Sequence, residues 1–204
     1  MNLDTYSDLQ DTVASYLARS DVTDQIPVFI KFAEIRLRRE LRMRQMLTTA
    51  TLTTTASDNT LTIPSDFLEA RDIYVSGNPN QSMEYVAPNV MSRSMRSTFA
   101  GKPSIYTVIG NDFQIAPIPD TVYTVKVLYY AAPDYLSDSN ETNTFLTEVP
   151  ELLLYASLIE AEPYIMNDPR LSTWISMYEK AVNQIRLNEQ NSQYSGVPLT
   201  MKVC

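Results

Sequence analysis

Carboxylates are the main residues that could do chemistry in this chain, because the other usual catalytic and metal-binding side chains are almost absent. The 204 residues include no histidine and a single cysteine, Cys204, at the C-terminus. These counts exclude Ser-His-Asp and Cys-His nucleophile pairs, imidazole bases, internal disulfides and thiolate metal sites. The four glycines are too widely spaced for a phosphate-binding loop. Most familiar enzyme classes are therefore excluded.

The carboxylates are concentrated in one stretch, residues 131–169, which holds eight acidic residues and no basic one. Paired carboxylates can hydrolyse glycosides or bind divalent metals, so Glu148, Glu151, Glu160 and Glu162 are the candidates. Metal-binding helical bundles use Glu-x-x-His pairs, and that pattern needs histidine. A solvated or protein-contact surface is therefore the favoured interpretation, with an active site as the alternative. We expect no cofactor and no bound metal.

A second charged segment has the opposite sign. Residues 31–44 hold six of the sixteen basic residues, among them Arg36, Arg38, Arg39 and Arg42. Arg38 and Arg42 are four residues apart and would be neighbours on a helix. Three interpretations stay open: a solvated face, a contact with the acidic stretch of a neighbouring copy, or nucleic-acid binding. The net charge of -8 and the pI of about 4.6 disfavour generic DNA binding.

The elements that position these charges begin with two N-terminal helices. Residues 5–19 predict the first helix, with Thr5 as N-cap and Asp8 in the first turn. Residues 24–45 predict the second, because apolar residues recur at helical spacing for over four turns and Pro27 falls in the first turn. The apolar stripe of the second helix comprises Ile26, Ile30, Ala33, Leu37 and Leu41.

The next segment has the periodicity of strands. Six of the eight residues from Thr48 to Thr55 are threonine, which suits a pleated sheet better than a helix. Ser57-Asp58-Asn59 predicts one hairpin and Gly110-Asn111 another. Seven short runs without crossover helices predict antiparallel pairing. Beyond the first hairpin, strands are expected at 70–76, 82–86, 104–109, 112–116 and 122–130, with a short helix near 88–96.

The C-terminal third is predicted to be helical again. Its first helix is apolar on most of its circumference, which is typical of a buried helix, and Pro163 should kink or end it. Residues 170–188 predict a last amphipathic helix. Residues 189–204 have no periodicity and predict an extended C-terminal arm.

These elements predict an α+β fold. An N-terminal helix pair in residues 1–46 and a C-terminal helix pair in residues 137–188 would form one helical bundle. A central antiparallel β region in residues 47–136 would be inserted between them. The first residues carry no secretory signal, and no apolar run reaches the about 18 residues that a membrane span needs. We therefore expect a chain that stays in the cytoplasm and has no membrane partner.

Four segments carry a resemblance to a known family. They are LTIPSDF at 61–67, GKPSIYT at 101–107, YYAAPDYL at 129–136 and NTFL at 143–146. In this order of helix pair, β region and helix pair, the chain resembles the head-to-tail adaptor proteins of tailed phages. It is similar to the tail tubular protein A type of short-tailed phages. The likeness covers roughly residues 5–185 and rests on many modest features.

The resemblance implies a virion structural protein that is not an enzyme. In such families identical subunits form a ring of about twelve copies beneath the portal protein. The ring extends the DNA channel and provides the attachment site for the tail nozzle or a tail fibre protein. Genomic DNA would pass through the lumen without sequence-specific binding, and an acidic lumen suits this passage. The expected location is the neck or tail of the virion, after assembly in the host cytoplasm.

The resemblance also suggests where the contacts lie. The subunit or portal interface would use Arg36, Arg38, Arg39 and Arg42. The C-terminal arm would dock on the portal through Tyr194, Val197, Leu199 and Met201. The β region would face the tail.

Three alternatives remain. The chain could be another neck or tail completion protein of the phage, in which case only its binding partner would differ. It could also be a DNA-packaging accessory factor that uses the basic helix, or a carboxylate-based, metal-dependent enzyme such as a nuclease or glycosidase. The missing histidine disfavours the enzyme most strongly.

Overall fold

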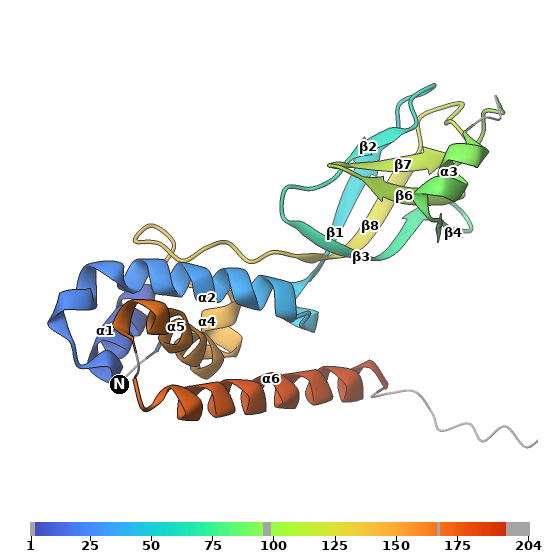
Figure 1. Cartoon of the computed structure of the whole chain (residues 1–204). Coiled ribbons are helices and arrows are strands. Elements are labelled where there is room, and N and C mark those ends of the chain that lie inside the picture. Colours follow the sequence, from blue (N-terminus) through green and yellow to red (C-terminus); the bar gives the residue numbers. More distant parts are fainter. Residues whose placement is uncertain (1–2, 96–98, 167, 195–204) are drawn as a thin grey trace, which may run out of the picture. The chain divides into compact units, whose positions relative to one another are not determined.

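The chain folds into two compact units, each described here by itself. The computed structural model describes all residues except 1–2, 96–98, 167 and 195–204. The helical unit comprises Met1–Gln45 and Pro133–Cys204, and the β unit comprises Met46–Ala132 (Figure 1). Helices dominate one unit and strands the other, so the fold is α+β, as the sequence predicts.

The helical unit is built around α5, which contacts α1, α2, α4 and α6. Leu152, Leu153 and Leu158 of α5 are fully buried, as expected for a helix that is apolar on most sides. Pro163 lies in the last turn of α5, and the helix ends two residues later. The α-helices of the unit are α1 (Tyr6–Leu17), α2 (Ile26–Glu40), α4 (Thr144–Glu148), α5 (Pro150–Ile165) and α6 (Leu171–Tyr194), and the short 3-10 helices are η1 (Ser20–Gln25) and η2 (Arg44–Met46).

The helix α1 begins at the predicted N-cap. The Thr5 side chain accepts a hydrogen bond from the Asp8 backbone N–H at 3.2 Å, and Asp8 Oδ2 accepts one from the Thr5 N–H at 3.2 Å. This reciprocal capping box satisfies two donors that a helix start leaves open. The helix ends at Ala18, whose backbone is left-handed at φ 51°.

The helix α2 is shorter than the predicted range of 24–45. Its buried stripe matches the prediction, but its regular part stops at Glu40. Leu41 is extended, and both Leu41 and Met43 are buried. Residues two apart lie on the same side of an extended chain, so this backbone buries both side chains and turns Arg42 away from them.

The last helix is longer than predicted. Trp174, Tyr178 and Val182 of α6 are buried at four-residue spacing, as an amphipathic helix requires. The helix continues through Tyr194, so residues 189–194, which the sequence assigned to an extended arm, are helical.

The β unit contains two four-stranded sheets. The first has the order β1-β8-β3-β4 and the second the order β2-β7-β6-β5. Its core includes Val125, Val127 and Phe113, and the Phe113 ring meets the Phe67 ring edge-on at 5.3 Å between centroids. The elements are β1 (Leu47–Thr53), β2 (Thr60–Thr62), β3 (Phe67–Val75), β4 (Gln81–Ser82), β5 (Glu84–Tyr85), α3 (Pro88–Ser94), β6 (Ile105–Ile109), β7 (Asp112–Ala116) and β8 (Thr124–Ala131).

The two predicted hairpins have different outcomes. The hairpin at Gly110 is confirmed, since β6 and β7 pair antiparallel and Gly110 has φ +63°, a conformation that glycine adopts without strain. The hairpin at residues 57–59 is wrong, because β1 pairs with β8 and β2 pairs with β7. The segment that joins β1 to β2 instead bonds to the segment before β8. The Thr54 N–H donates to Tyr123 O at 2.9 Å and the Ser57 N–H to Pro119 O at 2.8 Å.

The expectation of purely antiparallel pairing also needs a correction. The strands β5 and β6 pair in parallel, with Glu84 opposite Ile105 and Tyr85 opposite Tyr106. Parallel neighbours need a crossover connection, and α3 lies within the segment that joins these two strands. The sequence predicts this short helix near 88–96 but not its role as a crossover.

Replacing Leu152 tests the packing of the helical unit. We expect Leu152→Ala to lower the free energy of unfolding by about 2–5 kcal/mol, because it leaves a cavity at a fully buried site. Urea titration followed by the fluorescence of Trp174, the single tryptophan, measures this change. The matched control is Leu187→Ala in α6, which is 59% exposed and should stay within about 0.5 kcal/mol. Equal losses in both variants would contradict the assigned core.

Candidate functional site

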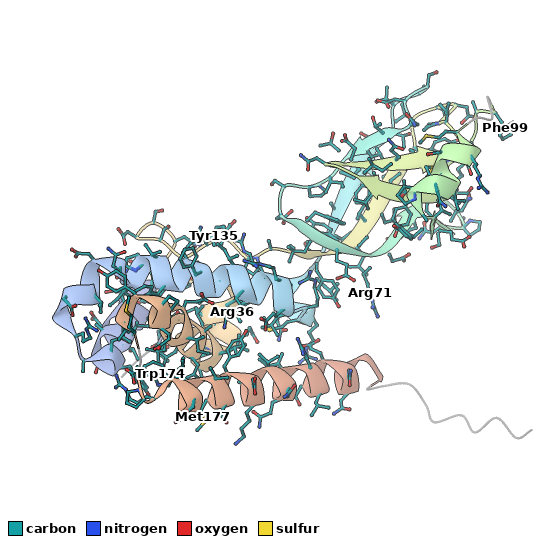
Figure 2. The ribbon with its side chains drawn as sticks, viewed as in Figure 1. Arg36, Arg71, Phe99, Tyr135, Trp174 and Met177 are labelled. Atoms are coloured by element: carbon teal, nitrogen blue, oxygen red, sulfur yellow. The ribbon has the colours of Figure 1, made fainter. Side chains whose placement is uncertain are left out.

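The sequence analysis gives the arginines of α2 as a candidate site, and most of their side chains make contacts with other residues of the same chain. Arg36 Nη2 lies 2.6 Å from Glu160 Oε1 of α5, and its guanidinium lies 5.8 Å from the ring centroid of Tyr178 on α6 (Figure 2). Both charged side chains are partly shielded, with 33% and 21% of their surface exposed. The acidic stretch therefore supplies a partner for Arg36 within the same chain.

Arg38 and Arg42 also have partners in the helical unit. Arg38 donates to Pro133 O, and its guanidinium carbon lies 3.4 Å from the ring centroid of Tyr135. Arg42 Nη1 donates to Arg38 O at 2.8 Å and to Leu41 O at 2.7 Å. A cation at the end of a helix stabilises the carbonyls that have no partner in the next turn.

Arg39 differs from the other three. It is exposed, and within the described residues it makes no hydrogen bond or ion pair. An exposed, unpaired charge can meet an external partner without breaking a contact within the chain. Of the four predicted arginines, Arg39 is therefore the one most open to a contact outside the chain.

A buried carboxylate lies on the same side of α2 as Lys31 and Arg38. Glu34 is 1% exposed, and its Oε1 accepts hydrogen bonds from the Leu136 N–H at 3.0 Å and from Asn143 Nδ2 at 2.7 Å. Its Oε2 is buried without a partner among the described residues. Burial raises the pKa of Glu34, although the two hydrogen bonds and the nearby charges of Lys31 and Arg38 oppose this rise.

Tyr135 completes this cluster. Its ring lies beneath two cations of α2, since Lys31 Nζ is 2.8 Å and the Arg38 guanidinium carbon 3.4 Å from the ring centroid. Burial lowers the pKa of Lys31. Sequence analysis missed Glu34, Tyr135 and Asn143 as structural determinants. The available signal was an acidic residue inside an apolar helical stripe, four residues after Ile30 and three before Leu37.

The outer face of α2 carries a stripe that the sequence analysis also missed. Val28, Phe32 and Ile35 recur at helical spacing, with Val28 42% and Phe32 50% exposed, and Arg39 continues the same stripe. Beside it lies a cavity of about 430 Å³, lined by Phe32, Arg36, Arg39, Glu40 and Glu160. An exposed apolar stripe that ends in an unpaired arginine has the composition of a protein-contact surface.

The carboxylates proposed for catalysis or metal binding do not gather. Glu160 pairs with Arg36, and Glu148 Oε2 accepts from Gln45 Nε2 at 2.9 Å. Within the part of the chain that the structure describes, no three acidic or cysteine side chains lie close enough to hold a metal ion. Glu151 is exposed on the first turn of α5, where its charge suits the helix dipole.

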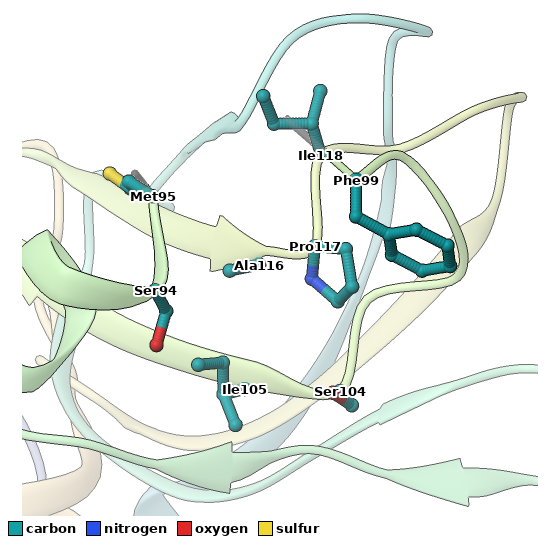
Figure 3. Close-up of a pocket in the computed structure, with 8 residues that line it drawn as sticks. All are labelled: Ser94, Met95, Phe99, Ser104, Ile105, Ala116, Pro117 and Ile118. Atoms are coloured by element: carbon teal, nitrogen blue, oxygen red, sulfur yellow. The ribbon is translucent and has the colours of Figure 1, made fainter. Parts of the chain in front are cut away.

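The β unit has its own apolar openings. A pocket of about 220 Å³ lies between α3, β6 and β7, with Ile105, Pro117 and Ile118 in its wall (Figure 3). Phe99, 69% exposed, lines the same pocket. A second groove of about 390 Å³ includes Tyr85, which is 56% exposed. These openings offer places where apolar side chains of another protein could insert.

The family model described as SU10 adaptor protein matches residues 4–202. The chain belongs to the SU10 adaptor protein family. The expected relation to phage head-to-tail adaptors is thereby confirmed, and the adaptor is a structural protein of a phage virion. No curated protein matches the adaptor.

The described part contains no helix that is long and apolar enough to cross a membrane. The predicted portal-docking arm cannot be placed, because Val197, Leu199 and Met201 lie outside the described residues. Tyr194, the fourth residue predicted for the arm, is the last residue of α6.

Removing the Glu34 carboxylate should loosen the helical unit. We expect Glu34→Ala to lower the free energy of unfolding by about 1–3 kcal/mol, because the buried Leu136 N–H and the partly buried Asn143 Nδ2 lose their acceptor. Urea titration with Trp174 fluorescence again gives the value. Glu179→Ala, an exposed residue on α6, is the matched control and should change little. A small effect at Glu34 would contradict its anchoring role.

The pH dependence of the free energy of unfolding tests the burial of Glu34. Because its folded-state pKa lies above the ordinary value of 4.5, the native state binds the proton more tightly than the unfolded state. The contribution of Glu34 to stability should therefore rise as pH falls through the raised pKa towards 4.5. We expect the stability of the unmodified adaptor to increase relative to that of Glu34→Gln over this window. A difference between the two that is constant with pH would show that Glu34 is not desolvated.

Proposed function

We propose that the adaptor forms a ring of about twelve identical subunits beneath the portal protein. In this role it extends the DNA channel and provides the attachment site for the tail nozzle or a tail fibre protein. The observation that carries the proposal is the family match over residues 4–202, almost the whole chain. A structural adaptor needs surfaces for copies of itself and for two neighbours, and it needs no catalytic centre.

The two units divide this work. In the proposal the helices act as one bundle that forms the body of the ring. The α2 arginines Arg36, Arg38, Arg39 and Arg42 would lie towards the neighbouring subunit or the portal. Arg39 would make the direct contact, because it has no described partner, and the others would shape the surface around it.

The β unit is the proposed contact with the tail. Its pockets beside Phe99 and Tyr85 are apolar and open to the surface, which suits contact with another virion protein. The acidic net charge of -8 supports passage of DNA through the lumen without specific binding, because like charges lower affinity.

The C-terminal arm is the proposed attachment to the portal. After the polar end of α6, apolar residues recur at Val197, Leu199, Met201 and Val203, alternating with other residues. An extended segment with this alternation presents one apolar side to a partner. Another neck or tail completion protein would share these properties and would differ in its partner, so binding to the portal decides between the two.

Removing the arm tests this attachment. The deletion should cover residues 195–204 and spare Glu189, whose Oε2 accepts from the Arg44 backbone N–H at 3.1 Å. We expect the shortened chain to fold normally and to lose binding to the cognate portal ring. Light scattering of chain and portal together measures the change, since the full-length adaptor should add many 23.1 kDa copies to the portal.

A substitution series separates the apolar side of the arm from its length. The triple variant Val197→Ser, Leu199→Ser, Met201→Ser should lose portal binding like the deletion. Its control, Thr200→Ala with Lys202→Gln, changes the alternate positions and should bind normally. Full binding by the deleted chain would exclude the arm as the attachment. Failure of the full-length adaptor to bind portal would instead favour a different place in the neck or tail.

A further inference from the structure

The strand β1 leaves one edge of its sheet open. It is the outermost strand of the order β1-β8-β3-β4, and all seven of its residues have partners on β8 (Figure 1). The Thr54 N–H donates to Tyr123 O in the same register, so the hydrogen-bonded pairs of this ladder fall on the even-numbered residues of β1. The backbone N–H and C=O groups of Thr49, Thr51 and Thr53 therefore point away from β8. These threonines are exposed and make no hydrogen bond at this edge with any residue that the structure describes.

This edge lacks the features that usually keep a sheet from pairing with another chain. Natural edge strands are short, carry charges or proline, or are bent by a bulge. The strand β1 has seven residues with no charge and no proline, and its register with β8 runs without a shift. The other outer strands, β2, β4 and β5, have only two or three residues. Among the described strands, β1 is therefore the long open edge that can accept a further strand.

One face of this edge is apolar. Ala50 and Leu52 are half-buried and pack against the core of the β unit. A strand added beside β1 would place every second side chain next to these two residues, on the core face of the sheet. The exposed threonines occupy the opposite face. The edge therefore fits an extended segment whose alternate residues are apolar.

The chain contains such a segment outside its described part. Residues 195–204 are the part of the C-terminal arm beyond α6, and apolar residues alternate with others from Val197 to Val203. This run has seven residues, which is the length of β1. The other residues outside the described part, 1–2, 96–98 and 167, are too few to pair along β1. The chain thus supplies both an open edge and a segment that matches it.

We propose that the C-terminal arm of a second copy of this chain adds to β1 as a further strand in the adaptor that has not met the portal. An antiparallel register with Met201 opposite Leu52 puts the apolar residues of the arm on the core face. In this register Lys202 exchanges backbone hydrogen bonds with Thr51, and Pro198, which has no N–H, falls beyond the end of β1. Exchange of an identical segment between copies is a low-cost route to association.

The inference goes beyond the proposed function, because it concerns the free adaptor. In the proposed function the portal binds the same arm, so β1 and the portal would compete for it. Binding to the portal would then leave the edge of β1 open again for contact with another virion protein. The contact between arm and β1 can be tested without the portal, so its outcome is independent of the portal attachment.

Hydrogen exchange of the full-length adaptor tests the added strand. The Thr51 and Thr53 N–H groups should exchange at least about tenfold more slowly than in the chain without residues 195–204, because the arm pairs with them. The Ala50 and Leu52 N–H groups bond to β8 and should exchange slowly in both chains, which shows that the deletion leaves the sheet intact. Dilution until light scattering shows single 23.1 kDa copies should remove the protection of the two threonines.

A single substitution blocks the edge without the deletion. Thr51→Pro removes an N–H that points away from β8, so the ladder between β1 and β8 stays complete. This variant should lose the protection at Thr53 and should stay a single copy at concentrations where the unmodified adaptor associates. Thr51→Ala keeps the N–H and is the matched control, which should behave like the unmodified adaptor.

The possible results separate this proposal from the proposed function. Equal exchange at Thr51 and Thr53 with and without the arm would overturn the added strand. Protection that persists in single copies would show that the arm of the same chain covers the edge, and would overturn the second copy as its source. Failure of the full-length adaptor to bind the portal would contradict the proposed function and leave the contact with β1 standing.

Discussion

The helical unit depends on one buried contact, the carboxylate of Glu34. The chain leaves this unit after Gln45 and returns at Pro133, so its N-terminal and C-terminal parts are far apart in sequence. Glu34 Oε1 holds the returning segment through the Leu136 N–H and Asn143 Nδ2. Asn143 in turn accepts from the Leu146 N–H at 3.0 Å and caps α4. Burying a charge is costly, and Oε2 of Glu34 has no partner among the described residues, so the two bonds to Oε1 and the nearby cations Lys31 and Arg38 have to offset that cost.

The segment that returns at Pro133 also contacts cations of α2, so fewer of them remain available for external contacts. The Tyr135 ring contacts the cations of Lys31 and Arg38, and Glu160 on α5 forms an ion pair with Arg36. A basic cluster in the sequence is thus largely used to close the fold, and its charge is dispersed over several faces. The exposed remainder at Arg39 lies beside the α2 stripe of Val28, Phe32 and Ile35. The positive charge available for an external contact is therefore concentrated in a few residues instead of spread along the helix.

Local patterns predict much of this fold, and they fail where the deciding contact is distant. The α2 stripe and the Gly110 turn depend on neighbouring residues, so periodicity and turn chemistry are sufficient to predict them. The turn at residues 57–59 looks equally local, but β1 pairs with β8, whose partner residues lie 71–83 positions later. Register in sheets is set by packing across strands, which a single strand does not reveal. The role of Glu34 is likewise not evident from the sequence, because only its partners far along the chain distinguish a buried carboxylate from a solvated one.

The proposed ring, through which DNA would pass, would face opposing electrostatic demands. A negative lumen keeps DNA mobile, yet copies with the same net charge repel one another when they approach. The adaptor sequence separates its charges, with no cation in residues 1–18 or 127–169 and six cations in residues 31–44. Contacts within the chain hold several of these cations, with Arg36 on the Glu160 carboxylate and Lys31 and Arg38 over the Tyr135 ring, while Arg39 and Arg44 are exposed. Charge at a contact acts within about 8–10 Å at physiological salt, so in the proposed ring an exposed cation would act only on groups close to it while the overall charge stays negative.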